Sequence, residues 1–254
     1  KALQSCTAHD LGQNFSKTFN ISFLNSGGHL EHVWQTSWGL STRSIGGLIM
    51  MHGDDGGLCL PPRLAPIQVI VLPVRNDEKI LASCKEIEHT LKMSDVRVQI
   101  DDAAHETIGF RINKWELKGV PLRIELGQKE IEQKVITIVR RDTGEKLRVP
   151  HQELAARVVE LLTHVQQSLY QTAEKFLKEN TKNIERYDAF KEILSDRRGF
   201  LSAFWCESAE CEKKIKEETK ATTRCLPLES VAQSGRCVYC GASAQYRWLF
   251  GQAY

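Results

Sequence analysis

The sequence contains no apolar run of membrane-spanning length, and no signal peptide precedes its first motif. It also contains no internal repeat and no low-complexity stretch, which argues against a solenoid fold or a long disordered tract. The formal net charge is only +2, so the charge balance alone does not indicate a nucleic acid partner. A cytoplasmic protein is the default expectation, although a targeting sequence that had been removed would leave no trace.

The sequence does contain enough apolar residues for more than one core. Its 254 residues, 41% of them hydrophobic, allow roughly two domains on the usual length prior. Changes in composition along the chain suggest boundaries that give three regions, 1–65, 66–165 and 166–254. The elements expected in them predict a multidomain protein of α/β and α+β class.

The first region has the signals of an antiparallel sheet. Residues 35–43 read as a strand, the Gly-closed segment 13–28 is expected to join strands, and an apolar run follows at 45–50. Gly and Pro punctuate both ends of the region. We interpret it as one half of a sheet, whose strand edges would be exposed if the region stood alone.

The second region alternates strand and helix signals. The apolar run at 67–74 predicts a buried strand, and the charged run at 77–94 predicts a helix after it. Further strand candidates lie at 96–101, 119–126 and 134–142. A long helix is predicted at 151–179, where apolar residues recur with a period near 3.6 and mark one buried face: Leu154, Val158, Leu161, Leu162, Val165 and Leu169. These elements predict an α/β domain with a mixed sheet.

Four cysteines in the third region have the spacing of a zinc ribbon. Cys206 and Cys211 form one close pair, and Cys237 and Cys240 form another. Four thiolates can surround one zinc ion tetrahedrally, and such a zinc would be structural because no coordination position stays open for catalysis. The alternatives are four reduced cysteines or two disulfides. The other cysteines, Cys6, Cys59, Cys84 and Cys225, are predicted to be buried apolar residues, with Cys225 as an alternative ligand.

Several motifs, in a fixed order, resemble prolyl-tRNA synthetase of class II. They are WQTSWGLSTRSIGGLIMMHGDDGGLCLPP at 34–62, KWELKGVPLRIELG at 114–127, VRRDTGEK at 139–146 and the terminal WLFGQAY. The resemblance is to the archaeal/eukaryotic-like type and covers nearly the whole chain. It implies part of the class II antiparallel catalytic sheet, an anticodon-binding domain and a small zinc-bearing C-terminal domain.

The resemblance also implies that this sequence is the C-terminal part of a longer protein. The chain begins at Lys1, without a methionine, and the two earlier class II motifs do not occur in it. Those motifs make the dimer interface and hold the α-phosphate of ATP with a second arginine. The full-length enzyme is expected to be a homodimer, and the present chain is expected to be inactive alone.

Resemblance to the third class II motif implies a set of ATP-binding residues. Arg43 matches the catalytic, ATP-contacting arginine, with Ser41 and Thr42 beside it. Gln4 and Thr7 match further ATP contacts, and Gln4 also acts through Mg²⁺. Arginine and magnesium suit this reaction because charge cancellation and positioning supply most of the catalysis at the α-phosphate.

His9 matches a residue that lines the pocket for L-proline in this family. An isolated histidine is more often structural, and the motif order is what favours the functional interpretation. Cys6, Ala8 and Asp10 stand where relatives more often have glycine, serine and an aromatic residue or histidine, which could change the size of the pocket. The nearby HGDDGG segment, with Asp54 and Asp55, is predicted to be an ordinary turn.

Resemblance also implies that Glu116, Arg123 and Lys146 bind the anticodon. A carboxylate can accept from base amino groups, and a guanidinium can donate two bonds to a guanine edge. Proline anticodons end in two guanines, and proteins read RNA sequence in single-stranded loops of this kind. The alternative for Glu116 and Arg123 is a surface ion pair of little energetic value. Nearby cations could face phosphates or solvent: Lys114, Lys118, Arg140 and Arg141.

The expected function is ATP-dependent attachment of L-proline to tRNA(Pro) through a prolyl-adenylate. The alternatives are a non-catalytic tRNA-binding module derived from a synthetase, or general RNA binding through a basic surface, which would depend strongly on salt. The terminal segment ending at Tyr254 has two interpretations of equal weight. Its carboxylate could approach the active site, or its aromatic residues could seal the small domain.

Overall fold

The computed structural model describes residues 2–196 and 198–254, which form two compact units. One unit comprises Lys1–Gly47 and Phe176–Tyr254, and the other comprises Leu48–Lys175. Among the described residues, no helix combines the length and the apolarity needed to cross a membrane. The three-region division of the sequence remains a prediction.

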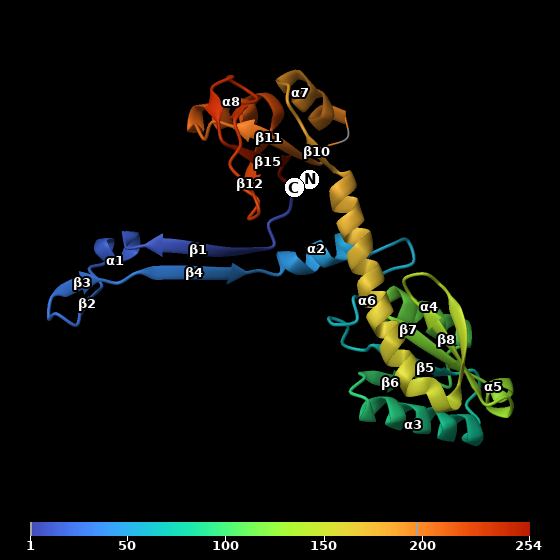
Figure 1. The fold of residues 1–254 in the computed structure, drawn as a ribbon. Coiled ribbons are helices and arrows are strands. Elements are labelled where there is room, and N and C mark those ends of the chain that lie inside the picture. Colours follow the sequence, from blue (N-terminus) through green and yellow to red (C-terminus); the bar gives the residue numbers. More distant parts are fainter. Residues whose placement is uncertain (1, 197) are drawn as a thin grey trace. The chain divides into compact units, whose positions relative to one another are not determined.

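The unit Leu48–Lys175 is built on a mixed five-stranded sheet (Figure 1). Its strands are β5 (Val69–Pro73), β6 (Val98–Ile100), β7 (Leu122–Leu126), β8 (Val135–Arg140) and β9 (Lys146–Pro150). In the order β6-β5-β7-β8-β9, β5 is parallel to both of its neighbours and β8 is antiparallel to both of its own. The helices are α3 (Glu78–Met93), α4 (Ile108–Leu117), α5 (Gln128–Glu132) and α6 (Leu154–Glu179), with a 3-10 turn, η1 (His151–Glu153), before α6.

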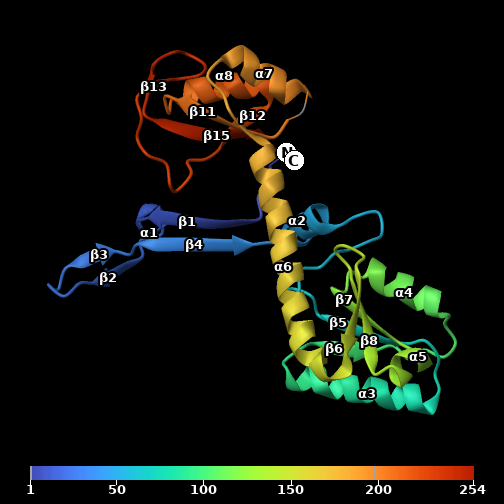
Figure 2. The ribbon, with the colours of Figure 1, turned by 45° about the vertical axis from the view of Figure 1, so that its right-hand side comes forward.

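Alternating side chains of this sheet supply two apolar cores. Val69 and Val71 of β5 pack in one core with α3 and α6, whereas Ile70 and Leu72 pack in the other with Trp115 of α4. In Figure 2, α3 and α4 lie on opposite sides of the sheet. The predicted α/β domain with a mixed sheet is therefore confirmed.

The long helix α6 buries the face that the sequence predicted. Every apolar position named for that face is buried or packs against the core: Leu154, Val158, Leu161, Leu162, Val165 and Leu169. The helix α3 begins where the side chain of Asp77 accepts a hydrogen bond from the backbone N–H of Ile80 at 3.1 Å. Apolar periodicity thus accounts for the buried face of α6, and a capping side chain accounts for the start of α3.

The C-terminal part of the other unit has a four-stranded sheet of its own. Its strands, in the order β10-β11-β15-β12, are β10 (Thr181–Asn183), β11 (Phe200–Trp205), β15 (Tyr246–Gln252) and β12 (Ala221–Cys225). Two helices, α7 (Tyr187–Asp196) and α8 (Ala209–Thr219), contribute to its core, and β13 (Gly235–Arg236) pairs with β14 (Ser243–Ala244). Phe190 and Phe250 are fully buried at the centre of this core.

The N-terminal part of the same unit is a pair of antiparallel ladders. The strand β1 (Cys6–Gly12) pairs with β4 (Gln35–Leu40), and β2 (Ser22–Leu24) pairs with β3 (Leu30–His32). The helices are α1 (Asn14–Thr18) and α2 (Arg43–His52). Large apolar side chains of the ladder are exposed, and Trp38 has an exposed fraction of 83%. The strands β1 and β4 form a two-stranded sheet, so each has an unpaired edge within the described residues, as expected for one half of a sheet.

The terminal segment pairs with the other end of the described chain. Ala2 and Ala253 form a parallel bridge, in which the N–H of Ala2 donates to the carbonyl of Gln252 at 2.8 Å and the N–H of Tyr254 donates to the carbonyl of Ala2 at 3.0 Å. The segment that precedes Gln4 is therefore hydrogen-bonded to the end of β15.

Two of the cysteine predictions are wrong. Cys59 and Cys84 are buried as expected, but Cys6 and Cys225 are exposed. Cys6 lies on the β1–β4 ladder, where the described residues provide no cover. Cys225 ends β12, a strand at the edge of its sheet, next to an irregularity in the pairing.

Candidate functional site

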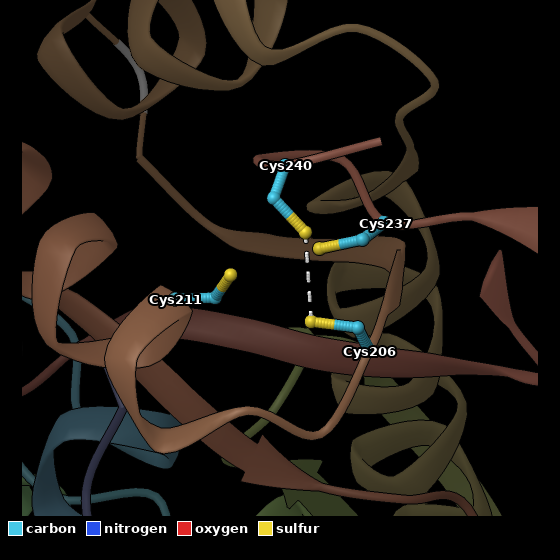
Figure 3. A group of neighbouring side chains, drawn as sticks. All are labelled: Cys206, Cys211, Cys237 and Cys240. Atoms are coloured by element: carbon cyan, nitrogen blue, oxygen red, sulfur yellow. Dashed lines mark hydrogen bonds between the residues drawn. The ribbon is translucent and has the colours of Figure 1, made fainter. Parts of the chain in front are cut away.

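The four clustered cysteines come from two separate parts of the C-terminal sheet. Cys206 directly follows β11, and Cys211 lies in the first turn of α8. Cys237 follows β13, and Cys240 ends the turn that leads to β14. Figure 3 shows the four sulfur atoms pointing toward one centre. Segments 206–211 and 237–240 thus supply two thiols each, and the two segments approach the centre from opposite sides.

The geometry of the four thiols fits one tetrahedral zinc ion. All four sulfur atoms lie within 4.8 Å of one another, and the Sγ atoms of Cys206 and Cys240 are 3.7 Å apart. Four sulfurs bonded to zinc at ~2.3 Å would be about 3.8 Å apart at the edges of the tetrahedron. All eight cysteines are free thiols, so the structure contains no pairing of the kind the disulfide alternative requires.

The thiols differ in their ease of deprotonation. Burial raises the pKa of Cys211 to about 12 and also raises the pKa of Cys206. The backbone N–H of Ala242 stabilises the thiolate of Cys240 and lowers its pKa to about 7. Zinc binds thiolates, so loading the site would release protons from Cys206 and Cys211.

The turn that carries Cys237 and Cys240 is held against its surroundings. The N–H of Val238 donates to the carbonyl of Phe204 at 2.9 Å. The hydroxyl of Tyr239 donates to Glu218 at 3.0 Å, and the ring packs edge-on against Tyr187 with centroids 4.9 Å apart. These contacts orient the second pair of thiols toward the first.

A second cluster lies on the α4 side of the five-stranded sheet. Glu116 is in the last turn of α4, Arg123 is in β7 and Lys146 begins β9. Arg123 of β7 and Lys146 of β9 both pair with Val139 of β8, which lies between them. Arg123, Val139 and Lys146 therefore form one row across the sheet, and Glu116 lies next to Arg123. The structure therefore brings the three predicted anticodon residues to one face.

Glu125 links the members of this cluster. Nη1 of Arg123 donates to Oε1 of Glu116 at 2.7 Å, and Nε of Arg123 donates to Oε1 of Glu125 at 2.9 Å. Nζ of Lys146 lies 3.6 Å from Oε2 of Glu125. The sequence motifs did not single out Glu125. Its position two residues after Arg123 on the same strand was the signal that it shares that face.

The helix α4 that carries Glu116 is fixed by a buried polar network. The indole of Trp115 donates to Oδ2 of Asp101 at 2.6 Å, and Nζ of Lys114 lies 2.6 Å from the same oxygen. Burial raises the pKa of Asp101, but the hydrogen bonds from Lys114 and Trp115 outweigh it and hold the pKa below its usual value. The buried Arg111 donates to the carbonyls of Asp101 and Pro73 at 2.7 and 2.8 Å.

The HGDDGG segment is the predicted turn, and it is fastened to the end of α4. Asp54 accepts two hydrogen bonds from Arg141, at 2.8 and 2.5 Å, and Nε of Arg141 donates to the carbonyl of Glu116 at 3.2 Å. A side chain at Gly57, where φ is +124°, would lie 2.5 Å from Cα of Leu117. The backbone of this turn can approach the helix closely only because residue 57 is glycine.

The cations around this cluster already have protein partners. Lys114 also pairs with Glu106, Arg140 pairs with Asp142, Arg141 pairs with Asp54, and the ammonium of Lys118 lies 4.4 Å from the ring centroid of Trp115. Contacts within the protein thus engage all four. These contacts favour neither predicted alternative for the four cations, that they face phosphates or that they face only solvent.

Two sequence families match separate parts of the chain. The family described as "Anticodon binding domain" matches residues 68–161, and the one described as "Prolyl-tRNA synthetase, C-terminal" matches residues 187–254. The chain is 44% identical over 255 residues to proline-tRNA ligase 2 of Clostridioides difficile (strain 630), covering 100% of this chain and 53% of that protein. The chain belongs to the prolyl-tRNA synthetase family.

Other members of the prolyl-tRNA synthetase family agree along the whole chain. Proline-tRNA ligase of Cytophaga hutchinsonii is 45% identical over 258 residues, which cover 100% of this chain and 52% of that protein. Prolyl-tRNA synthetase from Cryptosporidium parvum, complexed with halofuginone and AMPPNP, has a TM-score of 0.96 at 38% identity and covers 100% of this chain and 54% of that one. A second structure of the synthetase from that organism, complexed with L-proline and AMP, has a TM-score of 0.95.

The chain spans about half the length of the curated prolyl-tRNA synthetases it matches, and it corresponds to their C-terminal part. The predicted family and the predicted fold class are thereby confirmed. The activity of those longer enzymes comes to this chain as a proposal.

The residues that match the ATP-binding residues of the synthetase family lie on two neighbouring segments. Thr7 pairs across the ladder with Gly39, and the hydroxyl of Ser44 donates to the carbonyl of Ser5 at 3.1 Å. This bond brings the segment with Gln4 beside the start of α2, where Arg43 is the first residue. Ser41 and Thr42 come directly before Arg43. The side chains of these three residues and of Gln4 are exposed, and that of Thr7 is partly buried.

His9 lies on the same ladder as Thr7. It pairs with Ser37 of β4 and is exposed. Residues two apart on a strand point to the same face, so the strand directs Thr7 and His9 the same way. The structure brings these segments together but does not enclose the side chains within the described residues.

Proposed function

We propose that this chain is the part of an ATP-dependent proline-tRNA ligase that reads the anticodon of tRNA(Pro) and contributes the third class II motif to the catalytic domain. The observation that carries the proposal is the single cluster formed by Glu116, Arg123 and Lys146. That cluster lies inside the segment that matches the anticodon-binding family.

The chemistry of the cluster suits a guanine base. The guanidinium of Arg123 can donate to the O6 and N7 acceptors of guanine, and the carboxylate of Glu116 can accept from an exocyclic amino group. The side chain of Lys146 has an exposed fraction of 63% and can meet a phosphate or a base edge. A base that is splayed out of an anticodon loop offers all of these groups at once.

In the complete enzyme, the carboxylate of L-proline attacks the α-phosphate of ATP and pyrophosphate leaves, which gives prolyl-adenylate. Arg43 would meet the phosphate charge, with Ser41, Thr42 and Thr7 beside the nucleotide. Gln4 would contact ATP and hold Mg²⁺, whose role is to neutralise phosphate charge. His9 would line the proline pocket. The complete enzyme would act as a homodimer.

This chain alone is not expected to form prolyl-adenylate, because the arginine of the second motif is not part of it. ATP-pyrophosphate exchange that depends on proline is the relevant measurement. Exchange above background by the purified chain would contradict this expectation.

The four cysteines would hold one structural zinc ion. The donor set is complete, so the ion has no open position and stabilises the C-terminal sheet without taking part in chemistry. Elemental analysis of protein purified without added metal should give one zinc per chain. Replacing Cys237 with serine should abolish that zinc, whereas replacing Cys225 should leave it unchanged because this exposed thiol lies outside the cluster.

The test of anticodon reading is equilibrium binding at fixed salt. The chain is titrated with tRNA(Pro) and with the same tRNA in which each anticodon guanine is replaced in turn. We expect a loss of roughly 1–3 kcal/mol for each replaced base. Equal affinity for all of these RNAs, falling together as salt rises, would indicate only general RNA binding and would overturn the proposal.

A further inference from the structure

Glu125 occupies the centre of the proposed anticodon cluster. Its side chain, with an exposed fraction of 18%, divides its two oxygens between two cations. Oε1 accepts from Nε of Arg123 at 2.9 Å, and Oε2 lies 3.6 Å from Nζ of Lys146. One carboxylate therefore sets the spacing between two side chains that come from different strands.

Two carboxylates accept hydrogen bonds from the guanidinium of Arg123. Nε donates to Glu125, and Nη1 donates to Glu116 at 2.7 Å. A guanidinium is planar and has five N–H donors, so contacts at two of its nitrogens fix both its plane and its rotation. Within the part of the chain that the structure describes, Nη2 makes no hydrogen bond. The donors that stay available are those of Nη2 and the second N–H of Nη1.

The hydrogen bonds of Arg123 to Glu125 and Glu116 determine which N–H groups of the guanidinium can donate to a base. Arginine can offer a base either Nη1 with Nη2, or Nε with Nη2. With Nε held by Glu125, the second pairing is blocked, and the pairing that remains uses Nη2 and the second N–H of Nη1. We propose that Glu125 is a positioning residue for anticodon recognition, which fixes Arg123 and Lys146 so that Arg123 presents only the end of its fork to guanine. This inference rests on the proposed function.

Loss of Glu125 would affect selectivity more than affinity. A guanidinium released from Nε could turn and donate to other acceptors, including phosphate oxygens, which carry no sequence information. Removing one negative charge would also strengthen attraction to any RNA. The variant should therefore bind a mismatched anticodon nearly as well as the correct one.

The experiment compares Glu125→Ala with Glu145→Ala. Glu145 is the matched control, because it also pairs with an arginine, Arg140, at 3.5 Å and stands directly before Lys146 in the chain. For each protein, the ratio of affinities for tRNA(Pro) and for the tRNA with one anticodon guanine replaced by adenine is measured. We expect the ratio to fall about tenfold in E125A and to remain at the wild-type value in E145A.

Glu125→Gln separates positioning from folding. Its amide oxygen can still accept from Nε of Arg123, so we expect E125Q to recover part of the discrimination that E125A loses. Urea denaturation of each variant shows whether the sheet remains folded. In addition, the ¹⁵N–H signal of Arg123 Nε, recorded without RNA, should be protected from solvent exchange in the wild type and lost in E125A.

The possible outcomes distinguish failure of the proposed function from failure of the proposed role of Glu125. If the wild-type chain does not discriminate between the two RNAs, the proposed function fails and the inference fails with it. If the wild type discriminates and E125A keeps the full ratio, the inference alone is overturned. An unprotected Nε signal in the wild type would likewise overturn it, whatever the RNA measurements give.

Discussion

The five-stranded sheet and the β1–β4 ladder use the same backbone pairing but differ in their cover. All five residues of β5 are buried, whereas every residue of β4 after Gln35 is exposed. Helices pack on both faces of the first sheet. On the ladder, Trp38 and Leu40 have exposed fractions of 83% and 76%.

The difference shows that pairing alone does not make a stable sheet. A backbone hydrogen bond contributes only about 0.5–1.5 kcal/mol net, because water offers the same bonds to the unfolded chain. Burial of a large apolar side chain adds roughly 1.5–3 kcal/mol, and the ladder gains little of it. A two-stranded ladder without a covered face is marginal in water. The motif residues on the ladder therefore stand on a sheet that is less stabilised than the five-stranded sheet.

Zinc removal should have the largest effect. It tests whether the C-terminal sheet is stable through its own core, like the five-stranded sheet, or is weakly stabilised, like the β1–β4 ladder. That sheet has a core of its own but also a four-thiol site, whose zinc would contribute roughly 10–16 kcal/mol of apparent binding energy. Chelation should unfold residues around Cys237 and Cys240 and leave the transition of the five-stranded sheet in place. Amide hydrogen exchange resolves the two. Unchanged protection near these cysteines after complete metal removal would contradict the expectation.

Replacing one leucine in each sheet tests the comparison directly. Leu122 of β7 has an exposed fraction of 0% and Leu40 of β4 one of 76%, so the same change to alanine probes buried and uncovered strands. We expect L122A to lower the free energy of unfolding by roughly 2–5 kcal/mol. We expect L40A to change it by less than about 0.5 kcal/mol. Urea denaturation measures both, and similar losses in the two variants would break the comparison.

The Asp101 network should make the five-stranded unit sensitive to acid. Because the pKa of Asp101 is lowered in the folded state, its contribution is fully present above the unfolded pKa of about 3.9 and is lost as pH falls through the folded value. Asp101→Asn should cost roughly 1.5–3 kcal/mol at neutral pH, since hydrogen bonds to a charged group are lost. It should also flatten the pH profile below pH 4. Denaturation curves at several pH values, with D95N as the exposed control, provide the check.

The Asp54–Arg141 pair should give the smallest effect. Asp54 is more than half exposed, so solvent screens the pair even though its geometry is bidentate. Asp54→Ala should cost about 1 kcal/mol in unfolding free energy, and Asp55→Ala should cost nothing measurable. If both changes had the same effect, the ion pair would not be what fastens the turn.

Apolar periodicity predicted the covered regions well. The buried run of β5 and the stripe on α6 could be read directly, because their side chains pack in the same domain that the pattern describes. The exposure of Cys6 could not be read in this way. Its strand has an ordinary composition, and only the missing cover decides that the thiol is exposed.

The candidate site was predictable in its residue types but not in its connections. The sequence analysis predicted no helix around Glu116. The residue nevertheless lies in the last turn of α4, whose cap is Thr107, and the hydroxyl of Thr107 accepts a hydrogen bond from the N–H of Phe110 at 3.3 Å. The short helix carries a weak apolar pattern and was missed. The link through Glu125 depends on strand register, which places Lys146 in the same row as Arg123, with Val139 between them, and which local sequence does not encode.

The loop 226–234 between β12 and β13 has a practical consequence. It lies between the two cysteine pairs, and Leu228 and Val231 within it are exposed. Few of its backbone groups are hydrogen-bonded, with Ser230 bonded to Pro227 and Gln233 to Gln245. Because loop entropy rises slowly with length, about 0.6 kcal/mol per doubling, inserted residues should be tolerated there. A short peptide tag or a fluorophore could thus be placed at residue 229 without replacing any of the four clustered thiols.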